Sequence, residues 1–567
     1  MSKPFHPLFV LASTVILVTS VSGCFATRVD WKEPRFVSSQ IGMFRPIHKL
    51  GHAEQLYATA LQHEQLELES CVDLFFEVAM ITRHDDGGIQ GESNQCCLHK
   101  SALTKLVITG QKFGRLDPRL GLMVRRNGIE ECVPITHSGF VWHASDFHSL
   151  VPVGDYKTNA FRNHHRQPGL GVPLVVVLSG KSKDTLLPDR PIFAATIRLD
   201  CEHQFSGATS TIGSACRLQL LDPLRVDFVS NHGVHQRIAK DISAPLAYRL
   251  RNEKSKFLEN FIGSGSSDGE SRLYLVEPYQ PGKIPIVFVH GLLSDPYTWA
   301  EMVNELRATP GFFNHFQLWF FEYPTGRAFL SSAAQLRQKL ATARKTFDPY
   351  GQDSQLCNMV LVGHSMGGLV SKLQITSSGN FLWRSVANRP LHELRMSCEN
   401  RKKLADAFYF EPSPCISRVI FIGTPHRGSA LATRLIGRIG SSLASTPDEN
   451  VNEYENILRY NPGVFSPEMS RRLPTSIDLL EPKSRLLNTI AQLPVSPHVR
   501  MHSIIGNRYL TLRLGRSDGV VPVESARESR VLTERFVGAK HGKTKSHPES
   551  IHEVLCILRR HLEEIRR

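Results

Sequence analysis

Residues 359–368 read MVLVGHSMGG, and this stretch decides the fold class of the chain. The apolar run Met359–Val362 predicts a strand buried on both faces, and Met366 begins a helix. Between them lies the pattern Gly-x-Ser-x-Gly around Ser365. A serine hydroxyl is a good nucleophile only when a base removes its proton and the backbone presents it openly. A sharp strand-to-helix turn would present Ser365, and Gly363 and Gly367 would permit the strain and crowding of that turn.

The chain around this stretch alternates apolar strands with helices. Strands that alternate with helices form a parallel sheet covered by helices on both faces. Residues 272–567 are therefore expected to form an α/β fold with a mostly parallel, doubly wound sheet. The expected strands cover residues 286–289, 318–323, 359–362, 419–422 and 499–505, and the expected helices cover 299–306, 331–347 (capped by Ser331), 366 onward and 547–567.

A second motif, VFVHGL at residues 287–292, ends the first strong strand of this half. The attack of a serine on a carbonyl develops an oxyanion, which two preorganised N–H donors stabilise. The backbone N–H of Met366 at a helix start is one candidate. The N–H of Leu292 is the other, in a loop that Gly291 allows to turn tightly. His290 is expected to shape this loop rather than to act as a base.

A nucleophilic serine needs an acid and a base that follow it in the chain order Ser, Asp or Glu, His. Asp518, in the loop Ser517–Pro522, is the expected acid, which orients the histidine and stabilises its charged form. Glu524 and Asp478 are weaker candidates for the acid. His541 is the expected base because it lies in a loop after the acid and before the last helix. The competing bases are His547 and His552.

These motifs together resemble the α/β-hydrolase family. The resemblance covers residues 273–562 and is closest to bacterial lipase-like hydrolases and to the GPI inositol-deacylase group. It implies that Thr424 and His426 belong to a structural loop lining the pocket, with His364 part of the same pocket motif. Without the family pattern, His426 could be read as a second base. One departure is Lys540, which precedes His541 where the family often has glycine. The motifs are VFVHGLL (287–293), VGHSMGG (362–368), IGTPHRGS (422–429) and SDGVVP (517–522).

Two long stretches without strand patterns interrupt this half, at about residues 377–417 and 430–497. Such insertions usually form a cap over the nucleophile. Their apolar residues would give the cap an apolar inner face and favour a lipophilic acyl substrate, or would simply pack the cap on the core. These residues are Leu431, Leu435, Ile436, Ile439, Leu443 and Phe465.

The N-terminal half reads as an α+β accessory domain over residues 51–258, with helices within 53–109 and short strands after them. A Gly/Ser-rich linker at 259–271 separates it from the hydrolase half. His164 and His165 read as surface histidines, because no acidic or cysteine partners stand at metal-ligand spacing.

The first 23 residues resemble a lipoprotein signal peptide that ends before Cys24, followed by an irregular tether at 24–50. The apolar core is shorter than a membrane span requires. Lipidation of Cys24 would anchor the protein in a bacterial cell envelope, facing the periplasm or the outside. Ordinary signal cleavage and an uncleaved anchor remain open. The formal charge is +14, and its basic residues are scattered along the chain, which indicates a solvated basic surface. The alternative is that this surface attracts anionic lipid head groups or polysaccharide. No nucleic-acid partner is expected.

An exported chain can pair cysteines. Cys201 with Cys216 is the first expected disulfide and Cys398 with Cys415 the second. No CxxC or HExxH motif is present, so neither a metal site nor a cofactor is expected.

The sequence thus predicts a serine esterase or lipase-like enzyme working through an acyl-enzyme. An amidase or an acyltransferase that uses the same catalytic residues is the alternative enzyme activity. A non-catalytic envelope scaffold and a metal-dependent hydrolase are the alternatives of other classes. The oligomeric state is left open.

Overall fold

The computed structural model describes residues 29–32, 34, 48–83, 93–179, 186–203, 214–231, 234–252, 271–430, 448–470, 476–511 and 515–566. These divide into two compact units. The N-terminal unit holds the described residues up to 252 together with 307–313, and the C-terminal unit holds the rest. The expected signal peptide, Cys24, most of the linker and the cap residues Leu431, Leu435, Ile436, Ile439 and Leu443 lie outside the described residues.

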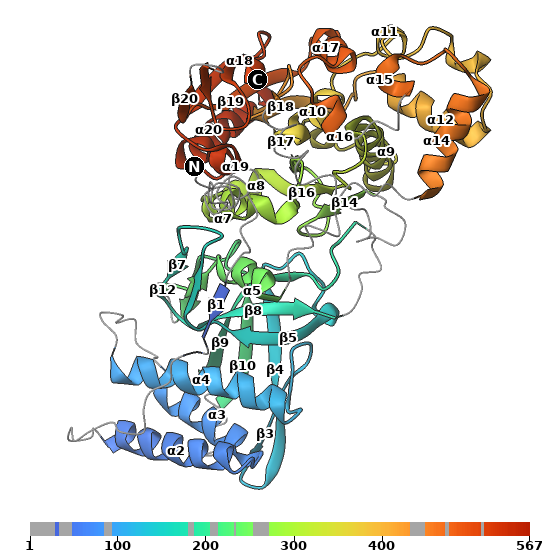
Figure 1. Ribbon diagram of the computed structural model, residues 1–567. Coiled ribbons are helices and arrows are strands. Elements are labelled where there is room, and N and C mark those ends of the chain that lie inside the picture. The colour runs from blue at the N-terminus through green and yellow to red at the C-terminus, as the bar shows by residue number, and fades with distance from the viewer. Residues whose placement is uncertain are drawn as a thin grey trace, which may run out of the picture. The chain divides into compact units, whose positions relative to one another are not determined.

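The N-terminal unit packs three helices against a mixed sheet of seven strands. The helices are α2 (His48–Gln65), α3 (Ser70–Thr82) and α4 (Asn94–Lys112), and their apolar faces form one core with the sheet. Figure 1 shows them side by side along the sheet. All strand pairs are antiparallel except β4 with β10. The strand order is β2 (Leu116–Asp117), β3 (Gly121–Arg126), β4 (Ile129–Ser138), β10 (Ser214–Leu221), β9 (Ile192–His203), β8 (Val172–Leu178), β5 (Phe147–Pro152).

Smaller elements complete this unit. Three two-stranded pairings join β1 with β6, β11 with β12 and β7 with β13. A short helix, α5, follows them in the chain. The bounds are β1 (Val29–Trp31), η1 (Ala144–Asp146), β6 (Tyr156–Thr158), β7 (Arg166–Gln167), β11 (Phe228–Asn231), β12 (Val234–Arg237), β13 (Lys240–Asp241) and α5 (Ala244–Asn252).

One expectation for this unit is corrected. The segment 24–50 is not irregular throughout, because Val29–Trp31 pairs with β6 and the Trp31 ring stacks on Tyr156 at 5.2 Å between centroids. His164 is partly exposed, as expected of a surface histidine, and its ring also stacks on the same tyrosine at 4.7 Å.

Of the two expected disulfides, one is confirmed and one is wrong. Cys201 and Cys216 face each other across the antiparallel pair β9–β10 and are bonded. Cys398 is an exposed free thiol at the start of α12 (Cys398–Phe408), and Cys415 is a buried free thiol directly before β18 (Ile416–Ile422). Cys415 lies instead beside Cys357, with 3.8 Å between the sulfur atoms.

The C-terminal unit is built on a second seven-stranded sheet. Only β14 runs antiparallel to its neighbour, and the other six strands are parallel. The central strands β15 and β17 are buried along their whole length, as strands covered on both faces must be. The order is β14 (Arg272–Leu275), β16 (Phe316–Glu322), β15 (Ile284–Val289), β17 (Met359–His364), β18 (Ile416–Ile422), β19 (Arg500–Gly506), β22 (Thr533–Val537).

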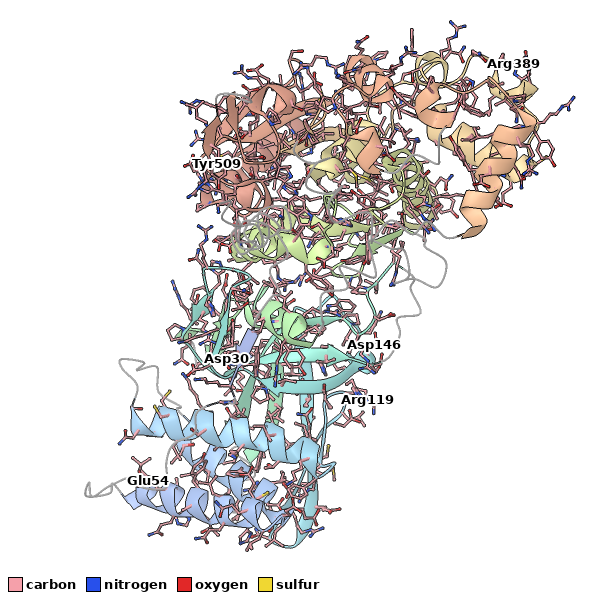
Figure 2. The ribbon with its side chains drawn as sticks, in the orientation of Figure 1. Asp30, Glu54, Arg119, Asp146, Arg389 and Tyr509 are labelled. Atoms are coloured by element: carbon pink, nitrogen blue, oxygen red, sulfur yellow. A yellow bond between two sulfur atoms is a disulfide. The ribbon has the colours of Figure 1, made fainter. Side chains whose placement is uncertain are left out.

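Helices connect these strands. The helix expected at 331–347 begins earlier, at Phe329, and its N-cap is Ala328 rather than Ser331. A hairpin of β20 (Tyr509–Thr511) and β21 (Gly515–Ser517) precedes the loop with Asp518, and Figure 2 labels its Tyr509. The connecting helices are η2 (Pro296–Trp299), α7 (Ala300–Ala308), α8 (Phe312–His315), α9 (Phe329–Phe347), η3 (Ser354–Cys357), α10 (Met366–Lys372), α18 (Val523–Ala526), α19 (His541–Thr544) and α20 (Pro548–Ile565).

Two helical insertions interrupt the sheet. Their backbones pair with each other, Ala387 with Phe465 and Thr376 with Val495. None of the helices that the structure describes is long and apolar enough to cross a bilayer. The insertions hold α11 (Phe381–Arg384), η4 (Leu391–Glu393) and α12 (Cys398–Phe408) before β18, and α14 (Asp448–Tyr460), α15 (Pro467–Ser470), α16 (Ser476–Leu479) and α17 (Arg485–Gln492) after it.

Candidate active site

Ser365 stands on a strained turn between β17 and α10. Its backbone has φ 55° and ψ −123°, a conformation that side-chain-bearing residues rarely adopt. The Ser365 N–H is held by the carbonyl of Ile422 on the neighbouring strand, at 2.9 Å. The side chain remains partly exposed, so the turn presents the hydroxyl where a substrate can reach it.

The glycines on either side of this serine are required by close packing. A Cβ on Gly367 would lie 2.2 Å from the carbonyl oxygen of Val289, and a Cβ on Gly363 would lie 2.6 Å from that of Gly367. Both distances are far inside van der Waals contact. The Gly-x-Ser-x-Gly spacing thus lets α10 start directly against β15.

The structure brings Ser365, His541 and Asp518 together. His541 Nε2 lies 2.9 Å from Ser365 Oγ, and its Nδ1 lies 2.7 Å from Asp518 Oδ2. A carboxylate only accepts hydrogen bonds, so Nδ1 carries the proton and Nε2 is left to accept the serine proton. This is the geometry in which an imidazole acts as a general base toward a hydroxyl.

The Asp518 carboxylate is buried and held from two sides. Its Oδ1 accepts from the backbone N–H groups of Val520 and Val521 at 2.9 and 2.7 Å, which leaves Oδ2 for the histidine. The Asp518 carbonyl also accepts from the His541 N–H at 2.9 Å. Gly506 makes room at the end of β19, since a Cβ there would lie 2.6 Å from the Asp518 Cβ. The acid and the base are thus bound to each other by both backbone and side chain.

The weaker candidates lie elsewhere. Glu524 has an 84% exposed side chain on α18, and Asp478 lies on α16. His547 is the N-cap residue of α20, and His552 is exposed on that helix beside Cys556. No hydrogen bond joins any of the four to Ser365 or His541 within the described part of the chain.

The expected oxyanion donors flank the nucleophile. A Cβ on Gly291 would lie 3.0 Å from the Ser365 Cβ, which places the loop carrying Leu292 directly beside the serine. Within the residues that the structure describes, the N–H groups of Leu292 and Met366 have no hydrogen-bond acceptor. Unsatisfied N–H groups at a helix start and its facing loop are the donors that an oxyanion needs.

Two further histidines of the motifs are buried beside Ser365 and contact backbone carbonyls of the loops around it. His290 Nδ1 faces the Gly291 carbonyl at 3.1 Å, its ring stacks on Tyr323, and burial lowers its pKa to about 4. His364 Nε2 donates to the His541 carbonyl at 3.1 Å. Burial, with Lys545 nearby, holds the pKa of His364 well below its ordinary value. Both rings are therefore neutral and hold the backbone of the loops beside Ser365.

The loop after β18 packs against the helix that follows the nucleophile and against its own strand. Thr424 packs on α10, where a Cβ at Gly368 would lie 1.9 Å from Thr424 Oγ1. His426 is buried edge-on against Phe421, and burial, with Lys372 nearby, holds its pKa well below its ordinary value. Within the described residues neither ring nitrogen of His426 has a hydrogen-bond partner, so this histidine is not paired with Ser365.

Several supporting residues were not singled out from the sequence. Tyr323 donates its hydroxyl to the His290 carbonyl at 2.6 Å, and Gly423 faces the Asp518–His541 pair with φ 55°. Tyr323 and Gly506 each stand at or just after a strand's carboxyl end, a position that could have drawn attention to them.

No protein-family model and no curated protein matches the chain. Solved structures are similar at a distance. A Bacillus licheniformis lipase in its mature form has 18% identity and a TM-score of 0.31, over 50% of this chain and 97% of its own. A lipase-esterase related protein from Clostridium acetobutylicum has 13% identity and a TM-score of 0.26, over 50% of this chain and 98% of its own. A structure reported with the carboxylesterases of Nitrososphaera gargenis has 11% identity and a TM-score of 0.28, over 53% of this chain and 98% of its own.

These likenesses are too distant to assign any residue or substrate. The fold rests on the strand order, the strained serine turn and the chain order Ser365, Asp518, His541. The C-terminal unit is an α/β-hydrolase-like, mostly parallel sheet with helices, and the N-terminal unit is a separate domain with a mixed sheet.

Proposed function

We propose that the C-terminal unit is a serine hydrolase that cleaves carboxylic esters through an acyl-enzyme. The observation that carries the proposal is the position of the His541 ring, which bridges Ser365 Oγ and Asp518 Oδ2. A serine, an imidazole and a buried carboxylate linked in this way provide nucleophile, general base and orienting acid.

In the first half-reaction, Ser365 Oγ attacks the acyl carbonyl carbon while its proton moves to His541 Nε2. The carbonyl oxygen becomes an oxyanion, which the N–H groups of Leu292 and Met366 stabilise. The imidazolium, stabilised by Asp518, then gives its proton to the leaving alcohol as the C–O bond breaks. The acyl group stays on Ser365.

In the second half-reaction, His541 takes a proton from water, and the resulting hydroxide attacks the acyl carbon. The second oxyanion collapses, Ser365 Oγ leaves and regains the proton from His541, and the carboxylic acid is released. The same groups thus serve both steps, and no cofactor enters the scheme.

The substrate that we propose is lipophilic, and the two insertions form a cap that receives it. The described parts of the insertions expose aromatic side chains, with Phe381 66% and Tyr460 59% exposed. The second insertion returns to the loop after β18, where the Ser429 N–H donates to the Leu480 carbonyl at 3.0 Å. Exposed aromatic side chains on segments anchored near the site suit an acyl chain.

We propose further that Cys24 carries a lipid that anchors the protein in a bacterial envelope. Small residues before a cysteine at the end of an apolar stretch support this. Growth with a labelled fatty acid tests it: label should appear in the wild type and be absent from Cys24→Ser. Equal labelling of the two would overturn the anchor without touching the hydrolase proposal.

The hydrolase proposal is tested with p-nitrophenyl esters of increasing acyl length. We expect hydrolysis by the wild type, loss of at least about a thousandfold in Ser365→Ala, and no change in the control Ser377→Ala, whose hydroxyl binds Glu411 instead. Hydrolysis that survives in Ser365→Ala would overturn the catalytic role. A strong preference for acetate over long chains would overturn only the lipophilic substrate.

A further inference from the structure

Two free thiols lie beside each other at the beginning of neighbouring strands. Cys357 is the last residue of η3, shortly before β17, and Cys415 directly precedes β18. The Met359 N–H donates to the Cys415 carbonyl at 3.0 Å, so the two strands are already paired at this point. The two sulfur atoms are 3.8 Å apart.

We infer that Cys357 and Cys415 form a second disulfide bond that ties the strand of the nucleophile to its neighbour. A disulfide requires an S–S distance of about 2.05 Å and Cα atoms about 4.4–6.8 Å apart. Neighbouring strands lie about 4.7–4.9 Å apart, so the paired backbones at this point satisfy the second condition. A rotation of the partly exposed Cys357 side chain covers the remaining distance, because the hydrogen-bonded backbones already fix the strands.

The pair lies away from the catalytic residues. Parallel strands β17 and β18 begin at the cysteines, whereas Ser365 follows the carboxyl end of β17. Six residues of extended strand separate the two ends by roughly 20 Å. The bond would therefore stabilise the sheet under Ser365 without contacting a substrate, and it does not depend on the proposed hydrolase activity.

A low-molecular-weight disulfide such as oxidised glutathione is a suitable oxidant. The Cys357 thiolate, the more exposed of the two, attacks one glutathione sulfur and releases one glutathione thiolate. The Cys415 thiolate then attacks the Cys357 sulfur and releases the second. The two protons of the cysteine thiols end on two glutathione thiols, so the protein loses two electrons and two protons and the oxidant gains them.

The two cysteines differ in how readily they form thiolates. Burial, together with the neighbouring Cys357, raises the pKa of the Cys415 thiol to about 11. The second exchange is therefore the slow step and should accelerate as the pH rises, since the thiolate is the attacking species.

The bond would close a loop with a sequence separation of 58 that contains Ser365, α10 and the first insertion. Closing a loop of this length restricts the unfolded chain more than the folded one. We expect the melting temperature of the full chain to rise by roughly 5–10 °C on oxidation.

The test treats the full-length protein with oxidised glutathione and maps its peptides without reduction. We expect a peptide linked through Cys357 and Cys415, a melting temperature above that of Cys357→Ser treated in the same way, and ester hydrolysis within twofold of the reduced protein. Cys398→Ser, which removes an exposed cysteine, is the matched control and should form the same link.

Two outcomes would overturn the inference. One is Cys357 that stays as a mixed disulfide with glutathione even after prolonged treatment at pH 9. The other is Cys415 linked to a different cysteine. A protein without esterase activity that still forms the link would contradict the proposed function but support the disulfide.

Discussion

His364 Nε2 lies 3.1 Å from the backbone carbonyl oxygen of His541, so the residue before the nucleophile holds the base in place. Because a carbonyl only accepts, Nε2 carries the ring proton and the Nδ1 atom is bare. That Nδ1 atom is buried with no partner in the part of the chain that the structure describes. His364 is thus a neutral positioning residue. It donates one hydrogen bond to the His541 backbone through Nε2, and within the described residues its Nδ1 atom accepts none.

Replacing His364 should therefore lower kcat through a misplaced base. We expect His364→Phe to reduce kcat about tenfold with little change in KM, because loss of the donor lets the loop with His541 shift. His364→Gln keeps an N–H donor at a similar reach and should retain more of the rate. Steady-state kinetics at pH 8 with a p-nitrophenyl ester decides it, and equal kcat values for the two variants would count against the positioning role.

Asp518→Asn should reduce kcat by about a hundredfold to ten-thousandfold. The N–H groups of Val520 and Val521 both point at one side-chain oxygen, so the amide oxygen of the variant must stay there. The amide NH₂ then faces His541 Nδ1 and forces the ring proton onto Nε2, where it blocks acceptance from Ser365. Glu524→Gln, at an exposed site on α18, is the matched control and should retain full activity. Retention of wild-type kcat by Asp518→Asn would exclude Asp518 as the acid.

Lys372 and Glu528 form a buried ion pair, with Lys372 Nζ 2.6 Å from Glu528 Oε2. Glu528→Gln should lower the free energy of unfolding by about 3–5 kcal/mol at pH 7, because it leaves the Lys372 charge buried without its carboxylate. Burial already lowers the pKa of Lys372, so the loss should shrink as the pH rises and the amine becomes neutral. Urea unfolding at pH 7 and pH 9.5 measures both values. Glu399→Gln, which breaks an exposed pair on α12, is the control and should change little.

Buried neutral histidines should make the protein less stable as the pH falls. Burial lowers the pKa of His290 to about 4, of His502 to about 3 and of His561 to about 4, whereas in an unfolded chain each titrates near 6.5. Below about pH 6.5 the unfolded chain binds protons that the folded chain does not. The stability is therefore complete above that pH and falls on acidification, by up to about 1.4 kcal/mol per pH unit for each histidine.

The urea midpoint between pH 7 and pH 5 measures this loss. His392→Asn, which removes an 81% exposed histidine, should leave the pH dependence unchanged. A midpoint that stays constant over this range would show that these histidines take up protons in the folded protein.

Much of the C-terminal unit could be predicted from the sequence because its signals are local. The apolar runs that lead into Ser365 and His290 are long enough to mark buried strands, and Ser365, Asp518 and His541 follow a fixed chain order. The edge strands β14 and β22 escaped prediction, because short edge strands lack a continuous apolar run.

The sequence does not show which residues far apart in the chain come into contact in the fold. Cys398 is the cysteine nearest to Cys415 in the sequence, whereas the sheet places Cys415 beside Cys357, which lies just before the neighbouring strand. The bond from His364 to His541 joins residues 177 positions apart and has no sequence signal at all. The start of α9 was misplaced because Ser331 is a good capping residue type, although Ala328 precedes the first helical turn.

The central claim is that Ser365 is a nucleophile activated by His541, and covalent labelling tests it most directly. Full-length protein is treated with a fluorophosphonate, digested and mapped by mass spectrometry. The account predicts one labelled site, Ser365, with labelling abolished in Ser365→Ala and slowed by at least about a hundredfold in a folded His541→Gln variant. Wild-type protein that stays unlabelled at Ser365, or that labels equally fast without His541, would contradict it.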